Sequence, residues 1–244
     1  MNLDEYRRMY EAEERQWWYV GMRAIAFALL DPNLARLGPA PRLLDAGCGT
    51  GHNLQELSAR GRAAGVDLSP EALSFCRLRG VQAVRGDLLT LPFPDATFTA
   101  VTSFDVIYHR WVSDDRAAVR ELVRVLRPGG LLFVRVPALR MLWGAHDEAV
   151  HSRHRYTRPE LVGLFRSEGL EVVRASYCNT LLFPLLALRR SLDRLLGRHG
   201  SDVQFLPAPL EALFRHLLLL ESHLVRHVSL PIGASVVVLG RRRC

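Results

Sequence analysis

Short apolar runs alternate with stretches of helical character along the first half of the chain. Each run is bounded by glycine, proline or acidic residues, as is typical of the buried strands of a parallel sheet. These predicted strands cover residues 43–45, 63–67, 81–85, 98–103 and 131–137. Helices are predicted at about 53–59 and 115–126, and Arg127-Pro128-Gly129-Gly130 stops the second one. This order of elements predicts an α/β fold with right-handed crossovers.

The second half of the chain adds two predicted strands, at 170–174 and 234–240. Between them lies a long helical insertion, residues 179–231, with helical segments at 181–196 and 210–228. Charged residues interrupt both segments, so neither offers the roughly 20 apolar residues that cross a bilayer. The insertion is interpreted as a lid or a dimer face. The alternative is an apolar substrate tunnel or a contact with a membrane surface.

The first 38 residues are predicted to form an N-terminal helical cap. Residues 2–30 have helical character and concentrate aromatic side chains, most densely at Trp17-Trp18-Tyr19. Pro32, Pro39 and Pro41 are expected to end this helix and lead into the first strand. The remaining residues, 39–244, are predicted to form a single domain that carries the insertion, as the length of 244 residues allows.

A small-residue loop, Gly47-Cys48-Gly49-Thr50-Gly51, follows the first predicted strand. A strand, a tight glycine turn and a helix start are the usual parts of a nucleotide pocket in an open parallel sheet. Dinucleotide-binding folds use G-x-G-x-x-G, whereas here His52 stands where the last glycine would fall. Asp45 precedes the loop, where a carboxylate would repel pyrophosphate and suit a cationic amine. An NAD(P)-dependent oxidoreductase is therefore disfavoured, and it is kept as the alternative enzyme class.

The stretch 45–51 resembles the first motif of the class I S-adenosylmethionine (SAM)-dependent methyltransferases, in particular the small-molecule, type 11-like enzymes. Further motifs follow in the same order at Asp67, Asp87 and 104–109, so the resemblance covers residues 43–137. It implies a Rossmann-like, seven-stranded, mostly parallel sheet whose last strand is antiparallel. It also implies SAM as the cofactor, methyl transfer as the reaction and S-adenosylhomocysteine as the product.

The resemblance also implies the contacts with the cofactor. Asp45 and the glycine loop would hold the methionine end, Asp67 the ribose and Asp87 the adenine. Asp67 also lies about 20 residues beyond the first glycine, where a ribose-binding carboxylate is expected. Tyr19 and Arg23 of the cap would face the methionine carboxylate. The predicted cofactor-binding residues are Tyr19, Arg23, Asp45, Gly47, Cys48, Gly49, Asn53, Asp67, Leu68, Asp87, Leu88, Phe104 and Asp105.

A polar loop at residues 138–157 follows the fifth predicted strand and is expected to bind the acceptor. His109 and His154 are the candidate catalytic bases, because histidine titrates near neutral pH. Arg155 is the candidate ligand for an anionic group. The substrate-binding residues are predicted to be His146, His151, Arg155 and Tyr156. A structural network around the next helix start is the alternative, and a metal site is disfavoured because the spacing fits no zinc signature.

Methyl transfer to oxygen, at a hydroxyl or a carboxylate, is the favoured reaction because the chain offers several histidine bases. Methylation at carbon or nitrogen is the alternative. The formal charge of +7 favours an acidic acceptor or an anionic surface. All 32 basic residues are arginines, and they are dispersed without an aromatic-basic strip, which disfavours a nucleic-acid-binding module.

The expected acceptor is a small natural-product or lipid-like molecule, and a homodimer and a peripheral membrane contact are left open. The four cysteines are scattered without C-x-x-C spacing, which favours a reducing compartment. The N-terminal residues lack the apolar core of a secretory signal. A cytoplasmic enzyme is therefore the expectation.

Overall fold

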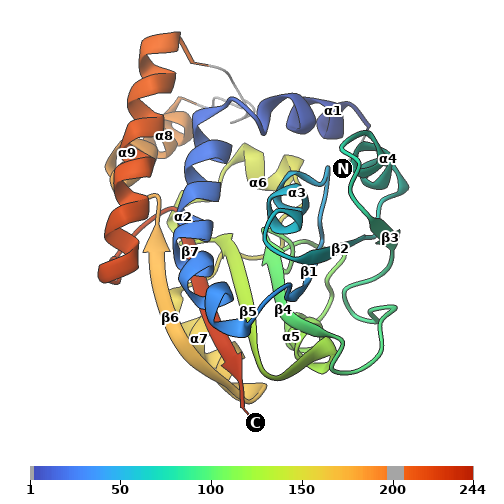
Figure 1. Ribbon diagram of the computed structural model, residues 1–244. Helices are drawn as coiled ribbons and strands as arrows, with labels where there is room; N and C mark the ends of the chain where they lie inside the picture. The colour runs from blue at the N-terminus through green and yellow to red at the C-terminus, as the bar shows by residue number, and fades with distance from the viewer. Residues whose placement is uncertain (1–2, 197–205, 244) are drawn as a thin grey trace.

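The computed structural model describes residues 3–196 and 206–243 and is built around one seven-stranded sheet (Figure 1). The strands are β1 (Arg42–Ala46), β2 (Arg62–Asp67), β3 (Ala83–Arg85), β4 (Phe98–Phe104), β5 (Leu126–Pro137), β6 (Leu170–Cys178) and β7 (Ser235–Arg242). Their order in the sheet is β3-β2-β1-β4-β5-β7-β6. β7 is antiparallel to both of its neighbours, whereas β1 to β5 pair in parallel. The predicted Rossmann-like sheet with an antiparallel last strand is confirmed.

Most strand boundaries agree with the sequence pattern, and β5 and β6 differ from it. β5 begins at Leu126, five residues before the predicted start at Leu131, and includes the Pro-Gly-Gly stretch. The pairing between β4 and β5 shifts its register between Phe98 and Ala100, and this irregularity accommodates the stretch beside β4. β6 continues to Cys178, because β7 offers it a partner over its whole length.

Helices cover both faces of this sheet (Figure 1). α5 and α7 pack on one face, and α2 and α9 pack on the other. Each pair buries its apolar side against the strands, which accounts for the continuous apolar character of β4 and β5. The helices are α1 (Leu3–Ala12), α2 (Trp17–Leu34), η1 (Ala35–Leu37), α3 (His52–Ser58), α4 (Pro70–Leu78), α5 (Asp115–Val125), η2 (Arg140–Leu142), α6 (Ala145–Ala149), α7 (Arg158–Ser167), α8 (Phe183–Leu195) and α9 (Ala208–His227).

The N-terminal cap consists of α1 and α2, and α2 continues through Pro32 to Leu34. This corrects the expectation that Pro32 ends the helix. Within the last turn a proline removes only the bond that its N–H would make to the Ala28 carbonyl. The Asn33 side chain adds a bond to the next carbonyl, donating from Nδ2 to Leu29 at 2.9 Å.

The cap and the insertion are packed directly against each other through α2 and α9. At Gly21 a Cβ atom would lie 2.4 Å from Cβ of Leu218, so only glycine allows the two helices to approach this closely. The backbone N–H of Trp17 donates to Oε2 of Glu211 at 2.9 Å, and Glu211 is buried. A carboxylate of α9 therefore caps the first turn of α2.

The insertion consists of α8 and α9, close to the two predicted helical segments; the loop between them, residues 197–205, lies outside the described residues. Glu221 of α9 ties the two helices together. Its Oε2 accepts from the backbone N–H of Thr180 at 2.8 Å and of Leu181 at 3.0 Å, just before α8. In the part of the chain that the structure describes, no helix combines the length and the apolar character needed to span a membrane.

Candidate active site

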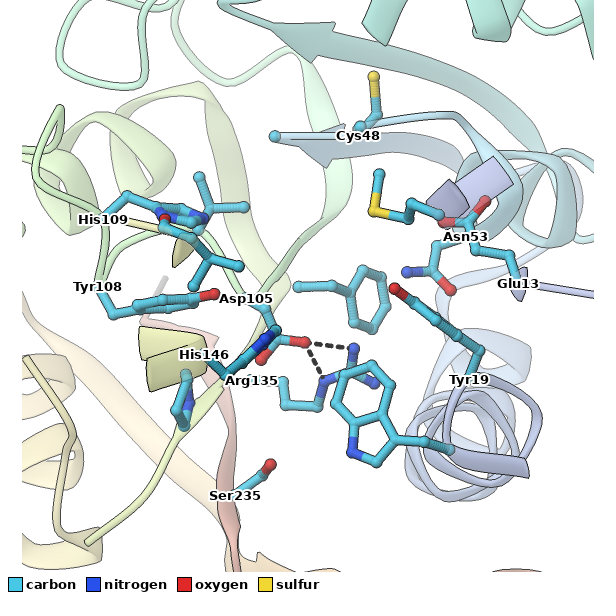
Figure 2. A pocket seen from close by; sticks show the side chains of 18 of the residues that line it. Glu13, Tyr19, Cys48, Asn53, Asp105, Tyr108, His109, Arg135, His146 and Ser235 are labelled. Atoms are coloured by element: carbon cyan, nitrogen blue, oxygen red, sulfur yellow. Dashed lines mark hydrogen bonds and ion pairs between the residues drawn. The ribbon is translucent and has the colours of Figure 1, made fainter. Parts of the chain in front are cut away.

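A cavity of about 550 Å³ lies at the carboxyl ends of β1, β2, β4 and β5. The cap, the glycine loop, the 138–157 loop and α8 all contribute to its wall. Figure 2 shows the two ends of this cavity with the Asp105–Arg135 pair between them. The glycine-loop end carries Glu13, Tyr19, Cys48 and Asn53, and the histidine end carries Tyr108, His109 and His146.

The glycine loop presents bare backbone to the cavity. Gly47 and Gly49 both have positive φ values, 80° and 53°, which favour glycine. A Cβ atom at Gly47 would lie 2.3 Å from Cγ2 of Val106, so the loop can lie against the segment after β4 only without a side chain here. Gly47, Cys48 and Gly49, which are predicted to contact the cofactor, therefore line the cavity with main-chain atoms. A ligand can lie directly against them.

Asp67 lies beside this loop, as the sequence predicted. Its Oδ2 accepts from the backbone N–H of Gly49, and its Oδ1 accepts from that of Ser69, both at 2.9 Å. Burial raises the pKa of Asp67. A carboxylate offers about four lone-pair sites, so these two bonds leave capacity for two hydroxyl donors.

Two leucines stand next to Asp67 and Asp87 and line the cavity. Leu68 is 46% exposed, and Leu88 is buried. Asp87 accepts from the backbone N–H of Leu89 at 2.9 Å through Oδ1. The arrangement suits a flat, apolar ring with polar groups at its edge.

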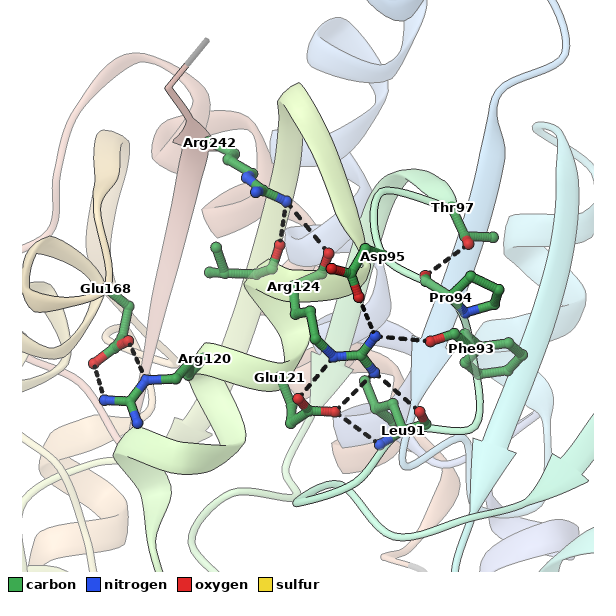
Figure 3. A network of polar contacts seen from close by, with 11 residues as sticks. Leu91, Phe93, Pro94, Asp95, Thr97, Arg120, Glu121, Arg124, Glu168 and Arg242 are labelled. Carbon is green, nitrogen blue, oxygen red and sulfur yellow. Dashed lines mark hydrogen bonds and ion pairs between the residues drawn. The ribbon is translucent and has the colours of Figure 1, made fainter.

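The loop that carries Asp87 and Leu88 is fixed to α5 by Arg124 (Figure 3). The Arg124 guanidinium donates to the carbonyls of Leu91 and Phe93 at 3.0 and 2.9 Å. It also donates to Asp95 at 2.7 Å and to both oxygens of Glu121 at 2.8 and 2.9 Å. One side chain thereby anchors residues 86–97.

Asp45 is not among the described residues that line the cavity, which differs from the expectation that it faces the ligand. It is almost fully buried behind the glycine loop, and Thr102 Oγ1 donates to its Oδ1 at 2.9 Å. Burial raises the pKa of Asp45 to about 7. Its position makes it a support of the loop.

The cap closes the glycine-loop end. Tyr19, Arg23 and Asn53, which are predicted to bind the cofactor, line the cavity there together with Glu13. Arg23 donates from Nη2 to the Glu13 carbonyl at 3.0 Å. The Glu13 carboxylate accepts from Thr50 and from Arg79, and burial raises its pKa. The cap is thus joined to the glycine loop through a buried carboxylate.

His109 is the predicted base that the structure brings to the cavity. Its Nδ1 lies 2.8 Å from the Val150 carbonyl oxygen, and a carbonyl only accepts, so Nδ1 carries the proton. Nε2 is therefore the basic nitrogen in the neutral ring. Burial lowers the pKa of His109, which keeps the ring neutral near pH 7. Tyr108 stacks on it with ring centroids 4.3 Å apart.

The other predicted acceptor residues are divided between the cavity and its surroundings. His146 and Arg155 line it, but Arg155 forms a buried bidentate pair with Asp147 at 2.7 and 3.0 Å, which compensates its charge. The cavity lining, as far as the structure describes the chain, does not include His151, His154 or Tyr156.

Each of these three side chains has a partner elsewhere. His154 is exposed, with Nε2 2.7 Å from Glu160, and the buried Tyr156 donates to Asp115 at 2.6 Å. His151 packs edge-on against Trp111 with centroids 5.0 Å apart. They are not positioned to contact an acceptor in this cavity.

An ion pair that the sequence did not reveal crosses the middle of the cavity (Figure 2). Arg135 of β5 donates from Nε and Nη2 to Oδ2 of Asp105, at 2.9 and 2.5 Å. The guanidinium lies 5.3 Å from the ring centroid of Trp18 and 5.4 Å from that of Phe104. Asp105 itself has a φ of 56°, an unusual conformation for an aspartate that this pair helps to hold.

The comparisons with known proteins agree with this geometry. Residues 44–134 match the family model of a methyltransferase domain. A probable SAM-dependent methyltransferase of Mycobacterium tuberculosis is 32% identical over 176 residues, which are 69% of this chain and 61% of that protein. Residues 44–134 are a methyltransferase domain of the class I SAM-dependent type.

Two further similarities extend this result. The malonyl-[acyl-carrier protein] O-methyltransferase of Serratia marcescens is 41% identical over 97 residues, 38% of this chain and 37% of that protein. A solved SAM-dependent methyltransferase of Thermotoga maritima shares the fold, with a TM-score of 0.58, 22% identity and coverage of 98% of both chains. This chain thus spans less than two thirds of the length of the curated relatives named here.

The cavity of this methyltransferase fits the cofactor of its family. The glycine loop leaves room where side chains would clash. Asp67 has free acceptor capacity, and Leu68 and Leu88 add apolar surface to the wall. Gln16 and Asn179 also line the cavity, and Oε1 of the first and Oδ1 of the second are buried without a hydrogen-bond partner. Such orphaned oxygens are costly unless a ligand or water donates to them.

Several lining residues of this methyltransferase were missed from the sequence. They are Glu13, Gln16, Trp18, Arg135, Asn179 and Ser235. Arg135 could have been identified from its position inside the apolar run 131–137, because a charged side chain in a buried strand needs a partner. Asn179 directly follows β6, and Ser235 begins β7. These two strands are far apart in the sequence, so no local pattern could group the two residues.

Proposed function

We propose that this methyltransferase transfers the methyl group of SAM to an oxygen atom of a small, amphiphilic, acidic acceptor. SAM, when bound, supplies an activated methyl carbon, so the protein mainly has to align the two reactants. The glycine-loop end would hold the cofactor, with Asp67 accepting from the ribose hydroxyls and Leu68 and Leu88 lying against the adenine. Tyr19 and Arg23 would cover the methionine end.

The observation that carries the choice of oxygen is the state of His109. Its Nδ1–H is engaged by the Val150 carbonyl, so the ring can accept a proton only at Nε2. A neutral, partly buried imidazole on the cavity wall suits the removal of a proton from a hydroxyl acceptor. A carboxylate acceptor needs no base, and the arginines of the wall would position it.

The character of the acceptor is proposed from the wall around the histidine end. Arg189 and Arg190 of α8 and His146 contribute positive or protonatable groups, while Leu142 and Leu186 contribute apolar surface. An acceptor with an acidic head and an apolar body matches both. Asn179 would receive a hydrogen bond from an acceptor hydroxyl through its orphaned Oδ1.

Two measurements test the proposal. Calorimetry with S-adenosylhomocysteine and, separately, NADH should give binding of the first alone; binding of NADH alone would overturn the cofactor assignment. Tritium-labelled SAM should then be offered with four acceptors of similar apolar tail, namely dodecanoic acid, dodecanol, dodecylamine and dodecyl acetoacetate. We expect label in the acid or the alcohol. Label confined to the amine or the acetoacetate would replace oxygen by nitrogen or carbon.

A further inference from the structure

The outer side of α8 carries a stripe of exposed leucines. Leu188 is 57% exposed and Leu195 is 82% exposed. The members of the stripe are separated by alternating steps of four and three residues, which places them along one side of a helix. They are Leu181, Leu185, Leu188, Leu192 and Leu195.

α9 carries a second stripe. Its buried side, with Leu218 and Val225, packs on α2 and the sheet. Its other side exposes Leu210, Leu213, Leu220, Leu224 and, just beyond the helix, Val228. Among the described residues, twelve of the eighteen large exposed apolar side chains fall between 181 and 232. We call the exposed apolar side chains of α8 and α9 the α8–α9 face.

The charges on the two helices that carry this face are predominantly positive. The two glutamates of α9, Glu211 and Glu221, are buried and turned to backbone donors of the protein. Arg194 of α8 and Arg226 of α9 are exposed. Asp193 of α8 lies 3.7 Å from Arg189 and is balanced by it. No other acidic residue occurs within the described parts of the two helices.

We infer that the α8–α9 face docks on the surface of an anionic lipid membrane. Amphipathic helices with apolar residues on one side and arginines beside them bind in this way, because apolar burial and charge attraction add. A second copy of the chain is a less suitable occupant, since an isologous interface would bring the same positive groups together. Charge complementarity therefore selects the lipid surface.

The position of α8 relates this face to the cavity. Leu185, Leu188 and Leu192 are exposed, whereas Leu186, Arg189 and Arg190 of the same helix line the cavity wall. A protein docked through α8 would hold this wall next to the lipid headgroups. The inference does not depend on the proposed reaction, because lipid binding is measured without cofactor or acceptor.

The test is co-sedimentation of the full chain with vesicles of phosphatidylcholine alone and of phosphatidylcholine with 30% phosphatidylglycerol. We expect binding to the anionic vesicles that weakens as salt rises. The triple variant L185Q/L188Q/L192Q should bind at least 100-fold more weakly, because three buried leucines are lost. Arg226→Gln should bind about fivefold more weakly, as expected for one charge near the surface. Leu78→Gln, at a leucine of α4 that is 70% exposed, is the matched control and should bind as the unaltered chain does.

Affinity for S-adenosylhomocysteine, measured by calorimetry, reports whether each variant keeps its fold and its cofactor site. Failure of the unaltered chain to bind anionic vesicles would overturn the inference, as would equal binding by the triple variant. Sedimentation velocity provides the remaining outcome. A dimer of the unaltered chain that the triple variant converts to a monomer would show that a second copy occupies the face.

Discussion

The Nδ1 atom of His109 donates to the Val150 carbonyl at 2.8 Å, and this bond sets which ring nitrogen can act as a base. We expect His109→Gln to lower methyl transfer to the acceptor by a factor of about 10² to 10⁴, the usual contribution of a general base. Affinity for S-adenosylhomocysteine should stay unchanged. His154→Gln is the control, because His154 is exposed and bonded to Glu160. Equal losses in the two variants would contradict the assignment.

The same residue determines a pH dependence. Only the neutral ring accepts a proton, and burial lowers the pKa of His109 below the ordinary 6.5. The rate should therefore rise with pH through a midpoint below 6.5 and be level from pH 7 to 8. A pH–rate profile measures this midpoint. A titration of the His109 ring by NMR then shows whether the midpoint is the pKa of His109. A midpoint clearly above 6.5 would remove His109 as the base.

Asp67 is expected to contribute charged hydrogen bonds to the cofactor. Asp67→Ala should weaken the binding of S-adenosylhomocysteine by about one to two decades, since bonds to an ionised group are worth about 1.5–3 kcal/mol. Glu71→Ala changes a nearby exposed carboxylate, which accepts from the Ser69 hydroxyl at 2.6 Å, and serves as the control. Calorimetry compares the two. Similar affinities would exclude Asp67 from the ribose site.

Asp45 should make stability depend on pH. Its folded pKa, about 7, is above the unfolded value of 3.8, so the folded state binds more protons between these values. Its contribution to stability is therefore lost as pH rises from about 4 to 7. Asp45→Asn keeps an acceptor for Thr102 and removes the titration. As pH rises within this window, the free energy of unfolding of the variant should increase relative to that of the unaltered chain by about 1.4 kcal/mol per pH unit. Urea denaturation at several pH values measures the difference, and parallel curves would contradict it.

The contact of Gly21 with Leu218 should make the α2–α9 interface intolerant of a larger residue. Gly21→Ala places Cβ 2.4 Å from Cβ of Leu218 and should destabilise the protein by about 1–3 kcal/mol. Gly163→Ala is the matched control, because nothing lies within 4 Å of a Cβ there and the helix gains about 0.5–1 kcal/mol. Thermal unfolding distinguishes the two. Adding Leu218→Gly, which removes the opposing Cβ, should make the additional cost of Gly21→Ala disappear.

Arg124 is expected to act on the cofactor from a distance (Figure 3). Arg124→Gln releases the carbonyls of Leu91 and Phe93, so the loop with Asp87 must be ordered when the cofactor binds. We expect a loss of about 0.5–1.5 kcal/mol in binding of S-adenosylhomocysteine. Arg120 lies on the same helix as Arg124, and its exposed side chain pairs with Glu168 at the end of α7. Arg120→Gln breaks only this pair and should leave affinity unchanged. Equal affinities of all three proteins would show that the loop is rigid without Arg124.

The sheet could be predicted from the sequence because the residues that specify each strand lie within that strand or next to it. Apolar runs ending in small or acidic residues give strands that end at one edge, as at Asp45 and Asp67. The start of β5 was missed because proline and glycine normally interrupt a strand, and only the shifted pairing with β4 accommodates them. Pro32 was misjudged for a similar reason, since its cost depends on its distance from the helix end.

The residues of the site could be predicted where a single loop supplies them. They were predicted less well where segments that are distant in the sequence come together. The glycine loop and Asp67 follow from spacing alone. The histidines at 146, 151 and 154 lie close in sequence, yet only His146 lines the cavity, because the turn after α6 directs the others outward to Trp111 and Glu160. Arg135 and Asp105 are 30 residues apart, and their pairing requires β4 and β5 to be neighbours.

The carboxylate of Glu211 on α9 receives the backbone N–H of Trp17, 194 positions earlier in the chain. Deleting the insertion would thus leave the first turn of α2, which precedes Tyr19 and Arg23, without its acceptor. The part of the cavity wall that Tyr19 and Arg23 form, which is proposed to cover the methionine end, would then lose its order. A form that lacks the insertion but keeps the glycine loop should accordingly bind the nucleoside poorly. Domain boundaries drawn around 39–178 alone would also remove β7, the strand that lies between β5 and β6.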